Sequence, residues 1–246
     1  MKTTFLHTLA ALLGAASLIA AAPAARADTV TGSGKVVTET RAVTGFQAVS
    51  SRLGGKLLLR QGTREGIDLS GDDNILPLIE TRVVDHDGVP TLEIGPKRGS
   101  SFTTRSTLSA TVDLITLKAI AMSGGGTVTI DALKTSSLKL ALSGSADVKL
   151  RQLSADELAV DLSGSGDLVF GGKATKLSVS ISGSGDVNSR ALEADDVSIS
   201  MAGSGDASVT ARKTLNVSIA GSGSVVYAGD PIVKSSIAGH GSVRKQ

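Results

Sequence analysis

The chain has 246 residues, with 25 basic and 23 acidic side chains and no cysteine. The lack of cysteine excludes disulfide bonds and a lipid anchor on a cysteine. Aromatic residues make up only 2% of the chain, so the aromatic faces that sugar clefts and protein hot spots use are scarce. Glycine is abundant, at 29 residues, and the apolar residues are mostly small aliphatics. This composition indicates thin, repetitive packing rather than a large globular core.

The first 27 residues are predicted to be a signal peptide. Lys2 precedes an apolar run over 5–22, and Ala25-Arg26-Ala27 is the small-x-small pattern that signal peptidase reads. The apolar run is short for a membrane span, and no basic stop-transfer residues follow it. We therefore expect an exported mature protein that begins at Asp28, has no membrane span, and is periplasmic or secreted.

Charge also limits the choice of partners. Removal of the signal peptide takes away Lys2 and Arg26 and leaves 23 basic and 23 acidic residues. Nucleic acids and anionic membranes attract proteins with a basic excess on one face. A balanced chain is therefore expected to bind neither.

The first part of the mature chain is expected to be less regular than the rest. Residues 28–45 are small and polar, which is typical of a lead-in arm or cap. Residues 46–117 read as short strands separated by turn clusters, and we interpret them as irregular coils. Within them, 74–78 is expected to form a brief helical turn and 97–106 a mobile loop. No linker follows, so 46–246 is predicted to be one continuous domain.

Residues 118–246 contain an internal repeat. The phrase Ser163-Gly164-Ser165-Gly166-Asp167 recurs with small changes, and the first glycine of each phrase lies at 124, 144, 164, 183, 203, 221 and 239. The spacing is therefore 18 to 20 residues. A period of this length is typical of a solenoid in which coils stack on one another.

Alternation around each phrase identifies the kind of solenoid. Leu158, Val160 and Leu162 alternate with small or polar residues, and the same pattern precedes the other phrases. A period of two predicts strands with one buried face, and the glycines allow a corner between strands. A leucine-rich repeat, a β-propeller and a calcium-binding nonapeptide repeat fit the pattern less well. We predict an all-β, parallel β-helix with about seven regular C-terminal coils.

The order of these segments resembles a known family. FQAV at 46–49, GKLLLRQG at 55–62 and DLSGDDNIL at 68–76, followed by stacked Ser-Gly-Ser-Gly-Asp phrases, is similar to the bacterial putative auto-transporter adhesin, head GIN domain family. The resemblance covers 46 to the C-terminus. It implies an exported, right-handed parallel β-helix that is adhesin-like and has no established activity.

One side-chain pattern raises the possibility of a metal site. Four corner aspartates are expected to stack about 4.8 Å apart along the rod: Asp147, Asp167, Asp186 and Asp206. Their mutual repulsion would be relieved by a bound Ca²⁺, which prefers oxygen ligands. The alternative is that each carboxylate caps the amides of its turn. We favour capping, because Ser224 and Ser242 replace the aspartate in the last two phrases.

No residue pattern predicts catalysis or a cofactor. His86 and His240 stand alone in the sequence, and the corner serines have no evident histidine and aspartate partners. We therefore predict a non-catalytic binding or scaffold module, adhesin-like and at the cell envelope, that binds an envelope, surface or glycan ligand and is able to oligomerise. Two alternatives stay open. One is a carbohydrate-active lyase or hydrolase that uses acids such as Asp167 and Asp186, and the other is a structural envelope component.

Overall fold

The computed structural model describes residues 29–246, so the predicted signal peptide at 1–27 lies outside the described part. The described chain is formed of strands, with one short 3-10 helix, η1 (Leu76–Leu78). This helix confirms the helical turn expected at 74–78. Within 29–246, no helix is long and apolar enough to cross a membrane.

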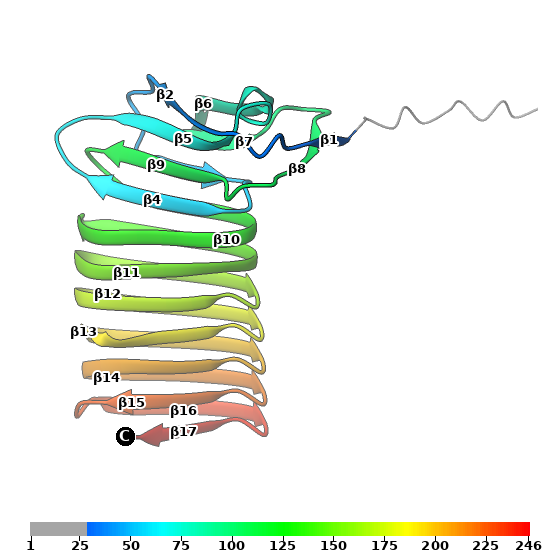
Figure 1. Ribbon diagram of the computed structural model, residues 1–246. Coiled ribbons are helices and arrows are strands. Elements are labelled where there is room, and N and C mark those ends of the chain that lie inside the picture. Colours follow the sequence, from blue (N-terminus) through cyan, green and yellow to red (C-terminus); the bar gives the residue numbers. More distant parts are fainter. Residues whose placement is uncertain (1–28) are drawn as a thin grey trace, which may run out of the picture.

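The C-terminal half is a parallel solenoid, as predicted (Figure 1). Each strand pairs in register with the equivalent segment of the next coil, so that Leu162 lies beside Ile181, Ile181 beside Met201 and Met201 beside Ile219. The structure has about six turns, because seven corners enclose six complete coils. The strands are β10 (Ala119–Lys134), β11 (Ser137–Gly164), β12 (Asp167–Gly183), β13 (Asp186–Gly203), β14 (Asp206–Gly221), β15 (Ser224–Ala228), β16 (Ile232–Gly239) and β17 (Ser242–Lys245).

Aliphatic side chains fill the interior of the solenoid. Leu158, Val160 and Leu162 are buried, and the residues between them are partly or fully exposed. The same alternation recurs in the coils above and below, so like residues stack into continuous apolar columns. One coil buries too little apolar surface to offset the entropy of ordering its backbone, and stability therefore depends on stacking.

Regular stacking begins earlier in the chain than the repeat does. β3 (Ala48–Ser51) and β4 (Lys56–Gln61) both pair in parallel with β10 and form its neighbouring coil. On their other side, β7 (Val89–Pro96) lies on β3 and β9 (Ser109–Leu114) lies on β4, also in parallel. The interior columns therefore continue into this less regular part.

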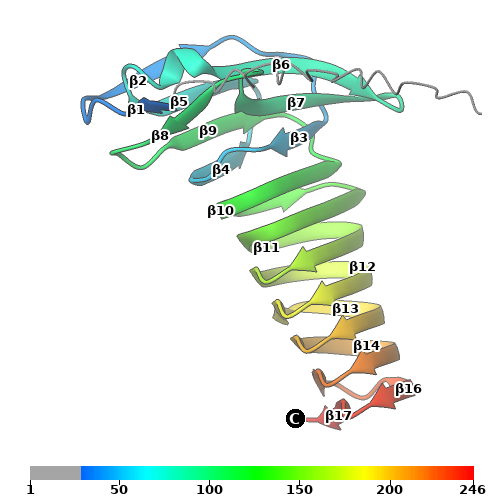
Figure 2. The same cartoon turned by 90° about the vertical axis from the view of Figure 1, so that its right-hand side faces the viewer.

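Antiparallel strands cover this end of the solenoid (Figure 2). β5 (Gly66–Asp72) pairs antiparallel with β9 and with β2 (Val36–Arg41), and β6 (Ile79–His86) pairs antiparallel with β7. Leu69 and Ile79, on these strands, are fully or almost fully buried. The strands thus shield one end of the apolar interior from water.

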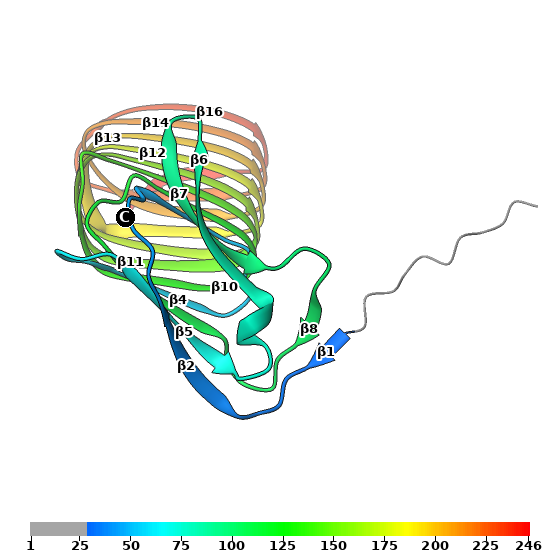
Figure 3. The same cartoon turned by 90° about the horizontal axis from the view of Figure 1, so that it is seen from above.

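A separate two-stranded sheet lies beside the cap. β1 (Thr29–Thr31) pairs in parallel with β8 (Ser101–Thr103), away from the outline of the coils (Figure 3). We expected a mobile loop over 97–106, and the structure instead places β8 within it. The sequence SFT at 101–103 is too short to show a period, so this pairing was not evident from the sequence.

Candidate binding surfaces

The predicted acidic ladder lies along one corner of the solenoid. The backbone N–H of Asp167 donates to Asp147 Oδ1 at 3.0 Å, and that of Asp206 donates to Asp186 Oδ1 at 2.8 Å. The N–H of Ser224 donates to Asp206 Oδ1 at 2.9 Å. Three of the carboxylates therefore link one coil to the next, whereas the expectation was that each would cap the amides of its own turn. Among residues 29–246, no group of three or more His, Cys, Asp or Glu is arranged to hold a metal ion.

His86 is not isolated in the folded chain, although it is in the sequence. Its Nε2 lies 3.0 Å from Glu93 Oε1, and Arg82 Nη2 lies 2.8 Å from Glu93 Oε2. The hydrogen bond from Arg82 holds the pKa of the buried Glu93 below its ordinary value, against the opposite effect of burial. The β6–β7 hairpin brings these groups together, and no sequence spacing indicates it. His240, in contrast, is exposed.

The strands that precede the corners form a flat face of small side chains. We call this the serine/alanine face. It consists of two outward columns that are stacked in register. One column contains Ala121, Ala141, Asp161, Ser180, Ser200, Ser218 and Ser236, and the other contains Ala119, Lys139, Ala159, Ser178, Ser198, Asn216 and Lys234.

Three shallow hollows lie along the serine/alanine face. Their volumes are about 340, 190 and 290 Å³ from the cap end to the C-terminal end. An ion pair of 3.6 Å joins Lys139 of one column of the face to Asp161 of the other. Between Lys139 and Lys234 the side chains of the face are short, so a flat or extended partner can lie across the coils between these two residues.

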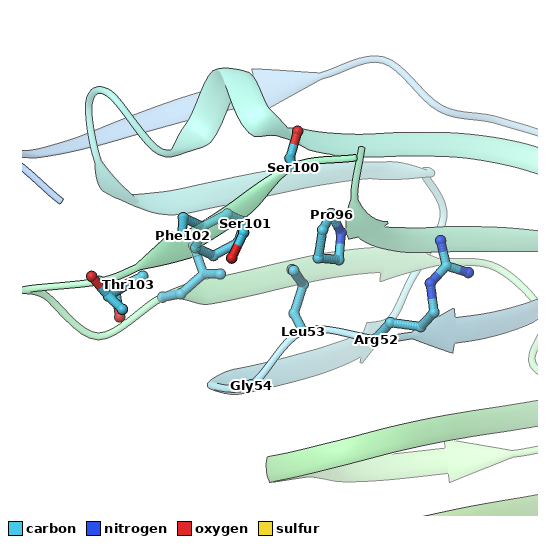
Figure 4. Close-up of a pocket in the computed structure, with 10 residues that line it drawn as sticks. Arg52, Leu53, Gly54, Pro96, Ser100, Ser101, Phe102 and Thr103 are labelled. Atoms are coloured by element: carbon cyan, nitrogen blue, oxygen red, sulfur yellow. The ribbon is translucent and has the colours of Figure 1, made fainter. Parts of the chain in front are cut away.

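A larger pocket, of about 540 Å³, lies between the first coil and the cap (Figure 4). Leu53, Pro96 and Phe102 gather in its middle, and Arg52 lies at one end. The lining residues are Arg52, Leu53, Gly54, Pro96, Ser100, Ser101, Phe102, Thr103, Thr104 and Leu108. No sequence pattern predicted this pocket. The available signal was the sequence RLGG at 52–55, where later coils have Ser-Gly phrases.

Comparison with protein families identifies the chain. The model of the family described as "Putative auto-transporter adhesin, head GIN domain" matches residues 45–231, which is most of the sequence. The chain belongs to this family. The resemblance inferred from the opening block and the repeats is therefore confirmed.

Solved structures similar to this head GIN chain have the same solenoid. A putative adhesin from Bacteroides fragilis is 26% identical with a TM-score of 0.83, over 88% of this chain and all of that one. A putative adhesin from Parabacteroides merdae is 23% identical (TM-score 0.72; 89% and 99% covered). A putative lipid binding protein from Parabacteroides distasonis is 22% identical (TM-score 0.74; 89% and 100% covered). No curated protein matches the chain.

Proposed function

We propose that the mature protein is an exported, non-catalytic and adhesin-like module that binds a surface or glycan ligand at the cell envelope. The serine/alanine face is the observation that carries this proposal. Serine recurs in successive coils of this face, about 4.8 Å apart, at Ser180, Ser200, Ser218 and Ser236, so a polymeric ligand meets the same contact several times. Membership of an adhesin family supports the same function.

Multivalent contact explains how such a face works without deep clefts. Each exposed hydroxyl, such as that of Ser200 or Ser218, offers one weak hydrogen bond, because water competes for it. Contacts along one rigid rod act at high effective concentration, so their combined affinity far exceeds that of any single contact. A rigid solenoid also loses little conformational entropy when it binds.

A glycan panel tests the proposal. Purified residues 28–246 are incubated with the panel, and both retention and cleavage are recorded. We expect retention without cleavage, and a loss of retention when Ser200 and Ser218 are changed to Lys. Val169→Lys, on the sheet beyond the corner and also exposed, is the matched control and should leave retention unchanged. Cleavage of a glycan would favour the carbohydrate-active enzyme, and the absence of both would favour a structural envelope component.

A further inference from the structure

The pocket in Figure 4 lies where one coil has no corner stacked on the corner of its neighbour. Ile94 of β7 lies on Ser51, and stacking resumes where Ser109 of β9 lies on Lys56. Four residues connect these points in the lower coil, whereas 14 connect them in the upper one. The upper chain therefore leaves the stack, and the lower corner at Leu53 and Gly54 has no corner directly above it. The space left above this corner is the pocket of about 540 Å³.

Hydrogen bonds hold the outer wall of the pocket in place. β8 is paired with β1, and the N–H of Gly32 donates to the carbonyl of Thr103 at 2.8 Å. Farther along, the N–H of Arg105 donates at 2.9 Å to Oδ2 of Asp72, which is fully buried. The wall is therefore formed before any ligand arrives, and binding need not order it.

Arg52 offers unused hydrogen-bond donors at one end of the pocket. Its guanidinium lies against Gly95, where an added Cβ would be 3.0 Å from Nε and Nη2. Its side chain is 44% exposed, and its ion pair, to Glu93, is long at 4.0 Å. Glu93 is already bound closely by Arg82 and His86. Within 29–246 the Arg52 side chain makes no hydrogen bond, so its planar fork is free to bind a carboxylate at two points.

The rest of the pocket is suited to a compact ligand that carries several hydroxyl groups. The ring of Phe102 and the side chains of Leu53 and Pro96 provide an apolar surface for the C–H groups of a ligand. Hydroxyls surround it, from Ser100, Ser101, Thr103 and Thr104. Among the lining residues Arg52 is basic and none is acidic, and the nearby Glu93 is paired with Arg82 and His86, so the charge at this end of the pocket favours an anion.

We propose that this pocket binds a sugar unit that carries a carboxylate. The carboxylate accepts hydrogen bonds from Arg52, the ring packs against Phe102, and the sugar hydroxyls pair with the serine and threonine hydroxyls of the wall. The site is separate from the serine/alanine face, because Arg52 and Phe102 belong to the first coil and the cap.

Calorimetric titration of residues 28–246 tests the proposal with three probes. Glucuronate carries the carboxylate on a sugar, glucose is the neutral sugar, and octanoate carries the carboxylate on an apolar body. We expect glucuronate to bind more tightly than glucose or octanoate, and higher salt to weaken its binding. Arg52→Gln should weaken glucuronate binding roughly 10- to 100-fold, and Arg52→Lys by less, since lysine keeps the charge and loses the fork.

The matched control is Arg64→Gln, which removes another exposed arginine, one that pairs with Asp113 at 2.8 Å outside the pocket. It should leave glucuronate binding unchanged, and thermal melts of each variant verify that the fold is intact. The proposal is overturned if glucuronate fails to bind, if glucose or octanoate binds as tightly, or if Arg52→Gln binds as the unchanged protein does. None of these results depends on the serine/alanine face, whose own test uses Ser200 and Ser218.

Discussion

The carbonyl oxygen of Gly183 lies where a side chain on Gly203 would have to begin. A Cβ added at Gly203 would be 2.0 Å from that oxygen, and Gly203 has a φ of +145°. Its amide plane therefore packs directly against the corner of the neighbouring coil. Similar contacts recur at the first glycine of the other stacked corners. Glycine therefore recurs every 18 to 20 residues because each corner makes a close backbone contact that only glycine permits.

Gly203→Ala should therefore destabilise the solenoid strongly. The methyl group cannot move away from a backbone oxygen without separating two coils, and the positive φ adds strain of its own. We expect a loss of roughly 3 kcal/mol or more in the free energy of unfolding, measured by denaturant titration. Gly125→Ala is the control, because Gly125 has no atom within 4 Å of an added Cβ and no positive φ. Equal stability of the two variants would contradict the close packing of corners.

The regular coils were predictable because short sequence patterns within each repeat specify them. Glycine corners and alternating aliphatics repeat along the sequence, and parallel stacking follows from the period alone. The cap was not predictable in the same way. Its antiparallel pairing of β2 with β5 joins segments such as Thr38 and Ser70, which share no repeated pattern.

Of the two binding surfaces, one was predictable from the sequence and the other was not. The serine/alanine face follows from the alternation, since every residue between buried aliphatics points outward. The pocket depends on where 14 residues leave the stack after Ile94 and on how β8 finds β1. No local pattern around Arg52 specifies either event, and the sequence shows only that the corner phrase is missing there.

Val160→Asp tests the inward orientation of the aliphatic columns. Val160 is 1% exposed, and a carboxylate there would be buried without a partner. We expect destabilisation by several kcal/mol and cooperative loss of the fold, read by thermal melting with circular dichroism. Val169→Asp makes the same chemical change at a residue that is 41% exposed, and it should alter the melting temperature little. A Val160→Asp variant that melts as the unchanged protein does would show that Val160 faces outward.

Asp72 should make the stability of the cap depend on pH. Burial alone would raise the pKa of this carboxyl, but hydrogen bonds from the N–H groups of Arg105, Ser106 and Gly34 outweigh burial and hold the pKa below its ordinary value. Because the folded pKa lies below the unfolded value of about 3.9, ionised Asp72 stabilises the protein above that pH. The contribution is lost as the pH falls through the folded pKa.

Asp72→Asn should therefore lower stability at neutral pH, and the difference from the unchanged protein should shrink progressively as the pH falls below about 4, the unfolded pKa. Denaturant titration from neutral pH into the acid range measures the difference directly. Asp131→Asn is the control, because Asp131 is exposed and pairs with Arg151 at 3.4 Å on the outside of the solenoid. A constant difference between Asp72→Asn and the unchanged protein at every pH would mean that the charge of Asp72 is not what stabilises the cap.

The last prediction separates hydrogen bonding between coils from calcium binding in the aspartate ladder. Asp186 Oδ1 accepts the N–H of Asp206 at 2.8 Å, so the carboxylate joins two coils without a cation. Asp186→Ala should lower the free energy of unfolding by roughly 1 kcal/mol or less, since the bond is exposed to water, whereas Asp186→Asn keeps an acceptor and should lose less. Neither calcium nor a chelator should move the melting temperature of the unchanged protein. A rise in melting temperature with calcium that Asp186→Asn abolishes would instead assign the stacked carboxylates to cation binding, because a carboxylate that only accepts an N–H from the next coil gains nothing from calcium.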